Sequence, residues 1–308
     1  MPGLTELVCA LGLQDRLVGR SHECDYPTSV SDLPILTSAN YPHSSGSESL
    51  QIHHSITELL QKALSIYDVD DKTLIDLNPD IILTQDHCEV CAVSYDDLSS
   101  AVKEALGNST EIVSASPTSL AEVCQSFVEV ADALGVRRRG EELTKSIQSR
   151  FDEIQNKTTQ LPKPNVVAIE WIDPLMTGGN WMPEMIEIAG GVSHLADAGK
   201  HSPWQEWGDI LACDPDILLV VPCGYGIPKT VTEMNSLTER ESWNNLTSVR
   251  QNNVFILDGN HYFNRPGPRI KESVEILAEI FHPDLFSGIS DSGGWIRFQG
   301  RSHAADHL

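Results

Sequence analysis

The sequence predicts an α/β protein of two Rossmann-like lobes with mainly parallel sheets, joined by a long connecting helix. Two similar phrases, residues 74–83 and 210–219, are each typical of a helix end, a proline turn and an all-apolar strand. Such continuous apolar strands indicate a parallel sheet that helices cover on both faces. Because the phrase occurs twice, we expect two lobes of similar build, with the helical pattern of residues 119–160 between them.

The first lobe is predicted over residues 1–117. Two short apolar segments, residues 17–19 and 80–84, are predicted strands. Polar and aromatic residues follow each of them. These residues are His22, Cys24 and Tyr26 after the first strand, and His87, Cys88 and Cys91 after the second.

The connecting region is predicted over residues 118–161. Its first part carries apolar residues at helical spacing, whereas its second part is more polar. Gly135 interrupts the pattern, and Pro162 and Pro164 end it. A helix of about twenty residues reaches roughly 30 Å, which is enough to join two lobes.

The second lobe is predicted over residues 162–283, with strands at residues 166–169, 217–221 and 254–257 and a helix at 270–281, followed by a weakly ordered tail at 284–308. Open α/β sheets bind ligands at the carboxyl ends of their strands. We therefore expect one shared cleft where the loops after these strands meet. The candidate residues on these loops and nearby are Trp171, Trp181, Trp204, Tyr225, His261, Phe263 and Arg265.

Each candidate has a structural alternative. Two tryptophans in a Gly-rich loop favour ligand contact over burial, whereas Trp204 and Tyr225 fit either role equally. Phe263 either contacts a ligand or holds its own loop, and Arg265 suits bidentate hydrogen bonds to amides or carboxylates.

Composition limits the function. The chain of 308 residues is 40% hydrophobic and 21% charged, as in globular proteins, and its formal charge of −23 argues against nucleic-acid binding. No apolar run is long enough to span a membrane, and the first residues lack the pattern of a secretory signal. We therefore expect a cytoplasmic protein.

The histidines and cysteines offer a competing interpretation. His22, Cys24, Cys88 and Cys91 are residue types that bind zinc in short spacings. Cys88 and Cys91 also fit a redox pair, and buried structural thiols remain a third alternative. The glycine patterns match neither a dinucleotide fingerprint nor a P-loop, and no nucleophile elbow is present, so enzymatic activity is not the favoured interpretation.

Several motifs together resemble the cobalamin-binding branch of the helical-backbone solute receptors, the cobalamin and siderophore class of ABC-transporter binding proteins. The resemblance covers roughly residues 2–283. It is carried by residues 19–27, by 84–85 with 88–93, by 170–171 with 181–185 and 189–191, and by 263–269. It implies two lobes with a ligand cleft between them and a cobalamin or related corrinoid as ligand. His22, His201 or His261 would then be an axial ligand to the cobalt.

Two departures from this family bear on transport. The strand that normally precedes residues 2–8 is absent, and the acidic docking positions fall at or near Lys72 and Gly208, with Asp70, Asp71 and Asp209 close by. Together with the missing signal, these departures argue against docking to an ABC permease. The prediction is therefore non-catalytic binding of a bulky corrinoid in the cytoplasm. One alternative is a soluble zinc- or thiol-dependent protein or enzyme on the same scaffold. Another is an interaction module whose cleft binds no small molecule. The sequence also leaves open whether the protein forms a homodimer.

Overall fold

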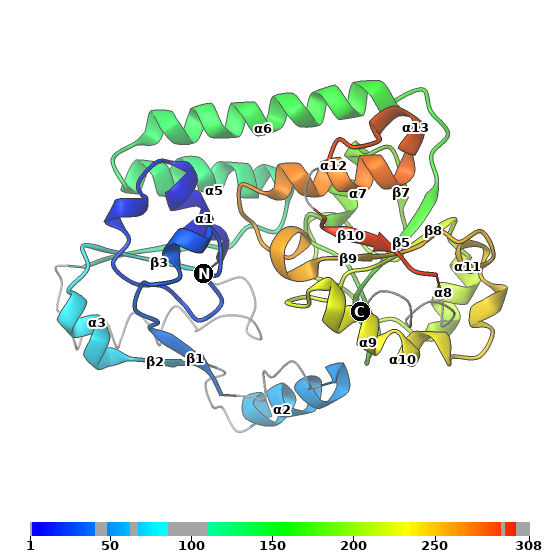
Figure 1. Ribbon diagram of the computed structural model, residues 1–308, viewed down its shortest axis with the longest axis horizontal. Helices are drawn as coiled ribbons and strands as arrows, with labels where there is room; N and C mark the ends of the chain where they lie inside the picture. Colours follow the sequence, from blue (N-terminus) through cyan, green and yellow to red (C-terminus); the bar gives the residue numbers. More distant parts are fainter. Residues whose placement is uncertain (1, 41–47, 62–66, 86–109, 291–292, 300–308) are drawn as a thin grey trace. The chain divides into compact units, whose positions relative to one another are not determined.

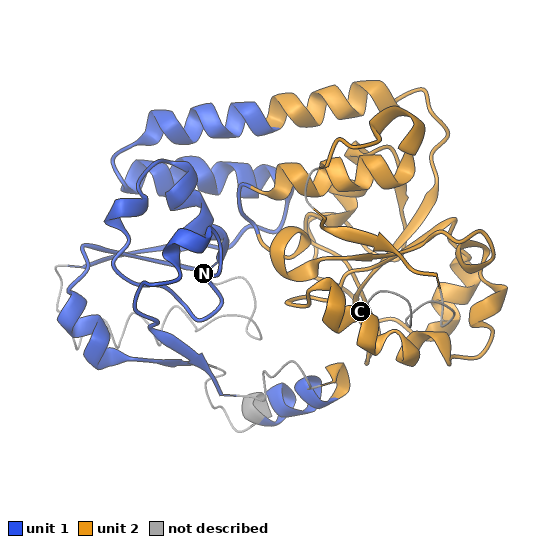
Figure 2. Ribbon diagram, in the orientation of Figure 1, with its two compact units in different colours: residues 1–47, 51–147, 266–268 blue, residues 48–50, 148–265, 269–308 orange. Residues whose placement is uncertain are grey.

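The computed structural model describes residues 2–40, 48–61, 67–85, 110–290 and 293–299 (Figure 1). The chain forms two compact units (Figure 2). Unit 1 comprises residues 1–47, 51–147 and 266–268, and unit 2 comprises residues 48–50, 148–265 and 269–308. In the described part of the chain, no helix is long and apolar enough to cross a membrane.

The described residues of unit 1 form two small sheets and several helices. Strands β1 and β2 pair antiparallel, with Thr37 opposite Val69, and β3 and β4 pair in parallel, with Ile81 opposite Glu111. The elements that lie wholly or partly in this unit are α1 (Pro2–Ala10), η1 (Gln14–Arg16), η2 (Thr28–Val30), β1 (Thr37–Ala39), α2 (Ser49–Gln61), β2 (Tyr67–Val69), α3 (Asp71–Leu77), β3 (Ile81–Gln85), β4 (Glu111–Ala115), α5 (Leu120–Ala133) and α6 (Arg137–Thr158).

The strand expected at residues 17–19 does not form. The turn η1 ends at Arg16, and Leu17 closes it by donating its N–H to the Gln14 carbonyl. Too few residues then remain before the next loop, and only Arg20 forms an isolated bridge, with Ile35. The strand expected at residues 80–84 is present as β3.

The repeated phrase has the same backbone conformation in both units. Asn78 directly follows helix α3, with φ 41° and ψ 61°, and Asp214 directly follows helix α8 (Trp207–Cys213), with φ 41° and ψ 64°. Asn and Asp tolerate this left-handed conformation better than other non-glycine residues. In each unit a proline follows, and a parallel strand begins two residues later.

The connecting region consists of two helices, where the sequence predicts one long helical region interrupted at Gly135. A capping box of Ser119 and Glu122 starts α5, and Gly135, at φ 73°, separates α5 from α6. Because φ is positive there, glycine avoids the steric penalty that other residues would incur. The boundary between the two units falls within α6 (Figure 2).

Unit 2 has a six-stranded mixed sheet. Its order is β10-β9-β8-β5-β6, with β7 also pairing with β5; β5, β7, β8 and β9 are parallel, whereas β6 and β10 are antiparallel to their neighbours. The elements are β5 (Asn165–Trp171), β6 (Met176–Thr177), α7 (Met182–Ile188), β7 (Val192–Ser193), α8, β8 (Ile217–Val220), α9 (Ile227–Glu233), α10 (Asn235–Thr238), η3 (Trp243–Asn245), α11 (Thr247–Arg250), β9 (Val254–Leu257), η4 (Gly259–Phe263), α12 (Ile270–Phe281), α13 (Pro283–Phe286) and β10 (Trp295–Arg297). Strand β10 lies in the segment expected to be a weakly ordered tail.

Helices cover both faces of this sheet, as the all-apolar strands predict. On one face, Val167, Leu218 and Ile256 belong to a buried cluster with residues of α8, α10 and η3. On the other face, Val166 lies beside Ile186 of α7 and Phe281 of α12, around Gly191. Unit 2 is therefore a three-layer α/β domain.

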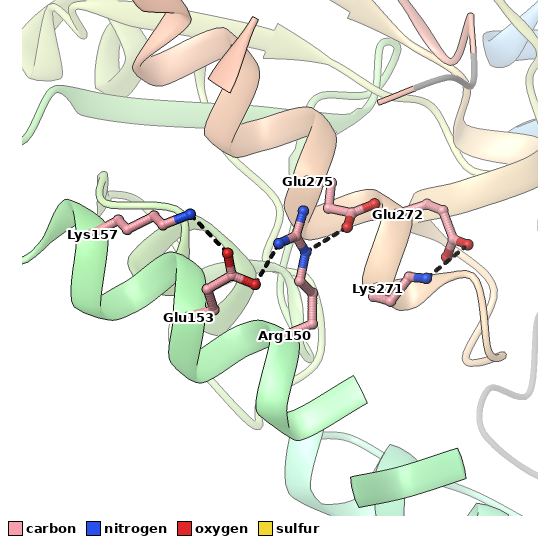
Figure 3. A network of polar contacts seen from close by, with 6 residues as sticks. All are labelled: Arg150, Glu153, Lys157, Lys271, Glu272 and Glu275. Carbon is pink, nitrogen blue, oxygen red and sulfur yellow. Dashed lines mark hydrogen bonds and ion pairs between the residues drawn. The ribbon is translucent and has the colours of Figure 1, made fainter. Parts of the chain in front are cut away.

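Ion pairs attach the second half of α6 to α12 (Figure 3). Arg150 Nε lies 2.6 Å from Glu275 Oε1, and its Nη1 lies 2.5 Å from Glu153 Oε2. Lys157 Nζ extends the network to Glu153 Oε1 at 2.7 Å. Hydrogen bonds to Glu275 and Glu153 outweigh the opposing effect of burial and raise the pKa of Arg150.

Candidate functional site

The loops that follow β8 and β9 are joined by hydrogen bonds to each other, and the loop after β8 is joined to the carboxyl end of β5, in the sheet of unit 2. Cys223 donates its N–H to the Glu170 carbonyl at 3.0 Å, and Asn260 donates its N–H to the Tyr225 carbonyl at 3.1 Å. The Asn264 Nδ2 group donates to the Val221 carbonyl at 3.1 Å. The sequence expectation that these loops meet is thus correct within unit 2.

Gly259 allows two of these loops to approach closely. A Cβ atom at this position would lie 2.1 Å from the Pro222 carbonyl oxygen and 3.0 Å from Asn264 Nδ2. Only a residue without a side chain fits this contact.

A row of large side chains lies on one side of the ribbon formed by β5 and β6. Trp171 pairs with Met176, and Met176 forms an antiparallel bridge with Trp204. Residues directly opposite each other in antiparallel strands place their side chains on the same face. The pairing shifts between Ile169 and Trp171, as in a β-bulge, and such an irregularity can turn a side chain away from the core.

Trp204 is the solvent-accessible end of this row of side chains. Trp204 is 56% exposed, whereas Trp171 and Met176 are half-buried. Trp171 also contacts Tyr225, with ring centroids 5.4 Å apart, and Lys229 Nζ lies 3.8 Å from the centre of the Tyr225 ring.

Buried polar contacts hold the segment that carries Trp204. The Ser202 hydroxyl donates to Glu170 Oε2 at 2.9 Å and accepts the Gly179 N–H at 3.0 Å. Asn180 donates its N–H to the Lys200 carbonyl at 2.6 Å. His201, a candidate axial ligand, places Nδ1 2.9 Å from the Ser202 carbonyl.

Asp258 orients His261. One carboxylate oxygen accepts the N–H groups of Asn260 and His261, and the other lies 2.8 Å from His261 Nδ1. Because an ionised carboxylate only accepts, the hydrogen in this last contact belongs to Nδ1, and Nε2 is the basic nitrogen of the neutral ring. The His261 side chain is 39% exposed.

Four other candidates are buried in unit 2. The exposed fractions of Trp181, Tyr225, Phe263 and Arg265 are 5%, 1%, 0% and 7%. Trp181 Nε1 donates to the Phe263 carbonyl at 2.9 Å, and Arg265 Nη2 donates to Asn260 Oδ1 at 2.9 Å. These side chains therefore connect the loops from within.

Three candidates of unit 1, His22, Cys24 and Tyr26, share one loop that Arg20 stabilises by hydrogen bonds. Arg20 donates to the carbonyls of Cys24 and Ser31, both at 2.9 Å. His22 Nδ1 lies 2.7 Å from the Thr37 hydroxyl, and Tyr26 is 45% exposed.

Cys24, the remaining candidate of unit 1, is 1% exposed and receives a hydrogen bond from the Thr5 hydroxyl at 3.0 Å. The other two cysteines of the expected metal set, Cys88 and Cys91, lie outside the described residues, as does His87. Among the residues that are described, no three His, Cys, Asp or Glu side chains are arranged to hold a metal ion. The zinc prediction therefore gains no support.

Sequence reasoning missed three contributors to the site: Met176, Lys229 and Asp258. Asp258 directly follows strand β9, so its position offered a signal. Lys229 lies four residues after Tyr225, a spacing too common to single it out. A cavity of about 360 Å³ beside Trp243, Val254 and Phe298 has none of the candidate residues in its lining.

Comparisons with known proteins agree with the fold. The family model described as periplasmic binding protein matches residues 2–261. An uncharacterized ABC transporter substrate-binding lipoprotein of Bacillus subtilis (strain 168), YvrC, is 26% identical over 295 residues, which cover 93% of this chain and 79% of the relative.

Two solved structures illustrate the likeness of fold. The periplasmic vitamin B12 binding protein BtuF of Vibrio cholerae superposes with a TM-score of 0.64 at 18% identity, covering 92% of this chain and 95% of that one. The periplasmic heme-binding protein RhuT from Roseiflexus sp. RS-1 gives a TM-score of 0.65 at 20% identity, with coverages of 92% and 95%.

These relatives correct one expectation. The prediction of a cytoplasmic protein is wrong, because the matched proteins are a lipoprotein and periplasmic receptors, which act outside the cytoplasm. The prediction relied on the first residues of the chain, and these do not determine the compartment. The argument against permease docking that used the same residues loses its basis, whereas the resemblance drawn from the motifs is confirmed.

Proposed function

We propose that this chain, which belongs to the periplasmic binding protein family, binds a bulky tetrapyrrole-type macrocycle without catalysing a reaction. Cobalamin or a related corrinoid is the first candidate ligand. The names of two proteins of the same fold, a vitamin B12 binding protein and a heme-binding protein, support a ligand of this size and shape.

The row of Trp171, Met176 and Trp204 carries the proposal. It offers flat and polarisable side chains on one face, next to the loops that follow the strands. An indole has 150–250 Å² of apolar surface, and a ligand can cover only the exposed part, so each tryptophan contributes at most about 2 kcal/mol to binding at about 25 cal/mol per Å². Corrin and porphyrin rings have broad apolar faces that match such a row.

His261 is the candidate for the axial ligand to a cobalt or iron centre. Histidines that bind metals commonly donate their other ring N–H to a carboxylate, which fixes the ring and raises the basicity of the coordinating nitrogen. The contact between His261 Nδ1 and Asp258 has this form and leaves Nε2 to act as the ligand. His22 in unit 1, with Nδ1 beside the Thr37 hydroxyl, and His201 stay predictions for the same role.

The buried candidates support the binding loops from the interior of unit 2. Trp181, Phe263 and Arg265 fix the positions of the loops, and this preorganisation favours affinity because the loops lose less entropy on binding. Tyr225 acts in the same way beneath Trp171. Ligand contact by Tyr26, which is exposed in unit 1, stays a prediction.

Calorimetric titration with aquocobalamin and with hemin tests the proposal. We expect saturable one-to-one binding of at least one of them, and a loss of at least about tenfold in affinity, or 1.4 kcal/mol, in Trp171→Ala combined with Trp204→Ala. Leu285→Ala, which removes a 50% exposed apolar side chain from α13, is the matched control and should leave affinity unchanged.

The absorption spectrum of the bound ligand tests His261 separately. His261→Ala should lose the spectral change that imidazole coordination produces, whereas His194→Ala, which removes an imidazole that lies 2.9 Å from Asn165 Oδ1, should keep it. If the wild-type protein binds neither macrocycle, the proposed function is wrong.

A further inference from the structure

Lys229 lies beside the proposed binding face and points its charge at an aromatic ring. It is on helix α9, in the first turn after the loop that carries Tyr225, and its Nζ lies 3.8 Å from the Tyr225 ring centre. Tyr225 in turn contacts Trp171 at 5.4 Å. A cation over an aromatic face is held by the ring quadrupole, so the ammonium group is positioned next to the row of tryptophans.

The nearby carboxylate does not neutralise this lysine. Glu233, one helical turn further along α9, is 7% exposed, and both of its oxygens accept the Ser49 N–H at 3.1 Å. Within the described residues, Lys229 has no ion pair. Three of the six other described lysines are paired: Lys157 with Glu153, Lys200 with Asp197 and Lys271 with Glu272.

Burial makes the lysine a favourable partner for an anion. Lys229 is half-buried, and burial lowers the pKa of its ammonium group, an effect that the charge of Glu233 partly opposes. An anion that approaches a partly desolvated ammonium interacts with it more strongly than with a fully hydrated one. The chain has a formal charge of −23, so an unpaired cation on the binding face also favours anionic ligands at that position.

We propose that Lys229 recognises an anionic oxygen group at the rim of the macrocycle, so that the ligand combines a flat apolar face with a carboxylate or phosphodiester. This inference rests on the proposed function and specifies its ligand class. A carboxylate is the rim group of a porphyrin with propionate side chains, whereas a phosphodiester lies in the nucleotide loop of a complete corrinoid. In both cases Lys229 determines specificity by charge, while Trp171 and Trp204 contact the ring.

Paired ligands that differ in the anionic group test the inference. Calorimetry is performed with hemin and its dimethyl ester, and with cyanocobalamin and dicyanocobinamide, which lacks the phosphodiester. For the pair that the wild-type protein binds, we expect the anionic member to bind at least about tenfold more tightly, and Lys229→Met to remove most of this preference. Lys229→Arg should retain it.

Control variants separate this role from general electrostatics and from folding. Lys200→Met removes a lysine whose side chain is 74% exposed from the same unit and should change the preference by less than about twofold. Unchanged far-UV circular dichroism and thermal midpoint in Lys229→Met establish that the fold is intact.

The outcomes distinguish the two proposals. If the wild-type protein binds none of the four compounds, both the proposed function and this inference are wrong. If it binds a macrocycle but Lys229→Met weakens the anionic and the neutral member equally, the proposed function stands and the charge recognition is refuted. A preference lost in Lys229→Met and kept in Lys229→Arg supports the inference, and the pair that shows it identifies the anionic group.

Discussion

The ion pair of Arg150 and Glu275 should contribute measurably to the stability of unit 2, and Glu275→Ala tests this. The side chains are only 24% and 12% exposed, and Nε and Oε1 lie 2.6 Å apart (Figure 3). Removing one partner of a buried pair costs about 3–5 kcal/mol, but here Arg150 keeps Glu153 as a partner. A charged hydrogen bond contributes about 1.5–3 kcal/mol, so we expect a loss of about 2 kcal/mol.

Tryptophan fluorescence during urea unfolding measures this loss in the relevant unit. All six tryptophans of the chain lie within residues 171–295, so their fluorescence reports on unit 2 alone. A loss of about 2 kcal/mol corresponds to a decrease of about 4–8 °C in the midpoint of a thermal transition. Because the slope of the urea transition reports on exposed surface, it should stay unchanged.

A matched variant and a double-mutant cycle complete the test. Glu272→Ala removes a carboxylate of α12 that forms an ion pair with Lys271 at 3.7 Å, and should cost no more than about 0.5 kcal/mol. Combining Arg150→Met with Glu275→Ala should give a coupling energy of at least about 1 kcal/mol. Equal losses in Glu275→Ala and Glu272→Ala, or additive single effects, would refute the assigned role of the pair.

Two further predictions concern Gly259 and His282. In calorimetric scans, Gly259→Ala should destabilise the protein by about 1–3 kcal/mol, because its Cβ would lie 2.1 Å from the Pro222 carbonyl oxygen, and it should also weaken macrocycle binding. Gly208→Ala is the control: a Cβ there would have nothing within 4 Å, so this variant should be neutral or stabilising in the same scans. Burial lowers the pKa of His282 below its ordinary 6.5, an effect that an interaction of the ring N–H with the Gly190 backbone carbonyl partly opposes. The unfolded chain therefore binds more protons than the folded chain below that pH, and stability should decrease as the pH falls from about 6.5. In urea titrations at several pH values, His282→Gln should reduce this dependence of stability on pH. An unchanged dependence would contradict the role given to His282.

Much of the fold was predictable because apolar runs determine where buried strands form. The strands β5, β8 and β9 occur within a residue or two of the expected positions, and α12 has the expected limits of Ile270 and Phe281. Short edge strands were not predictable. Strand β10 has only three residues, and its formation depends on pairing with β9, a long-range contact with no local pattern.

The positions of the site loops were predictable, but the exposure of their side chains was not. Trp181 and Trp204 are the same residue type, yet their exposed fractions are 5% and 56%. The difference arises from tertiary contacts, since Trp181 Nε1 bonds to the Phe263 carbonyl, whereas Trp204 lies at the edge of a short ribbon. The direction of Trp171 depends on a shift in strand register, and no periodicity reveals such a shift.

This division between buried and exposed aromatics has a functional consequence. A receptor must hold its contact residues in place before the ligand arrives, because ordering loops on binding lowers affinity. Trp181 and Phe263, which join the segment after β6 to the one after β9 by a hydrogen bond of 2.9 Å, perform this task while they are buried. Substituting them should therefore lower stability as well as affinity, whereas substituting Trp204 should lower affinity with little effect on stability. Residues of one type, on neighbouring loops of one face, thus have separable roles that follow from burial and not from sequence position.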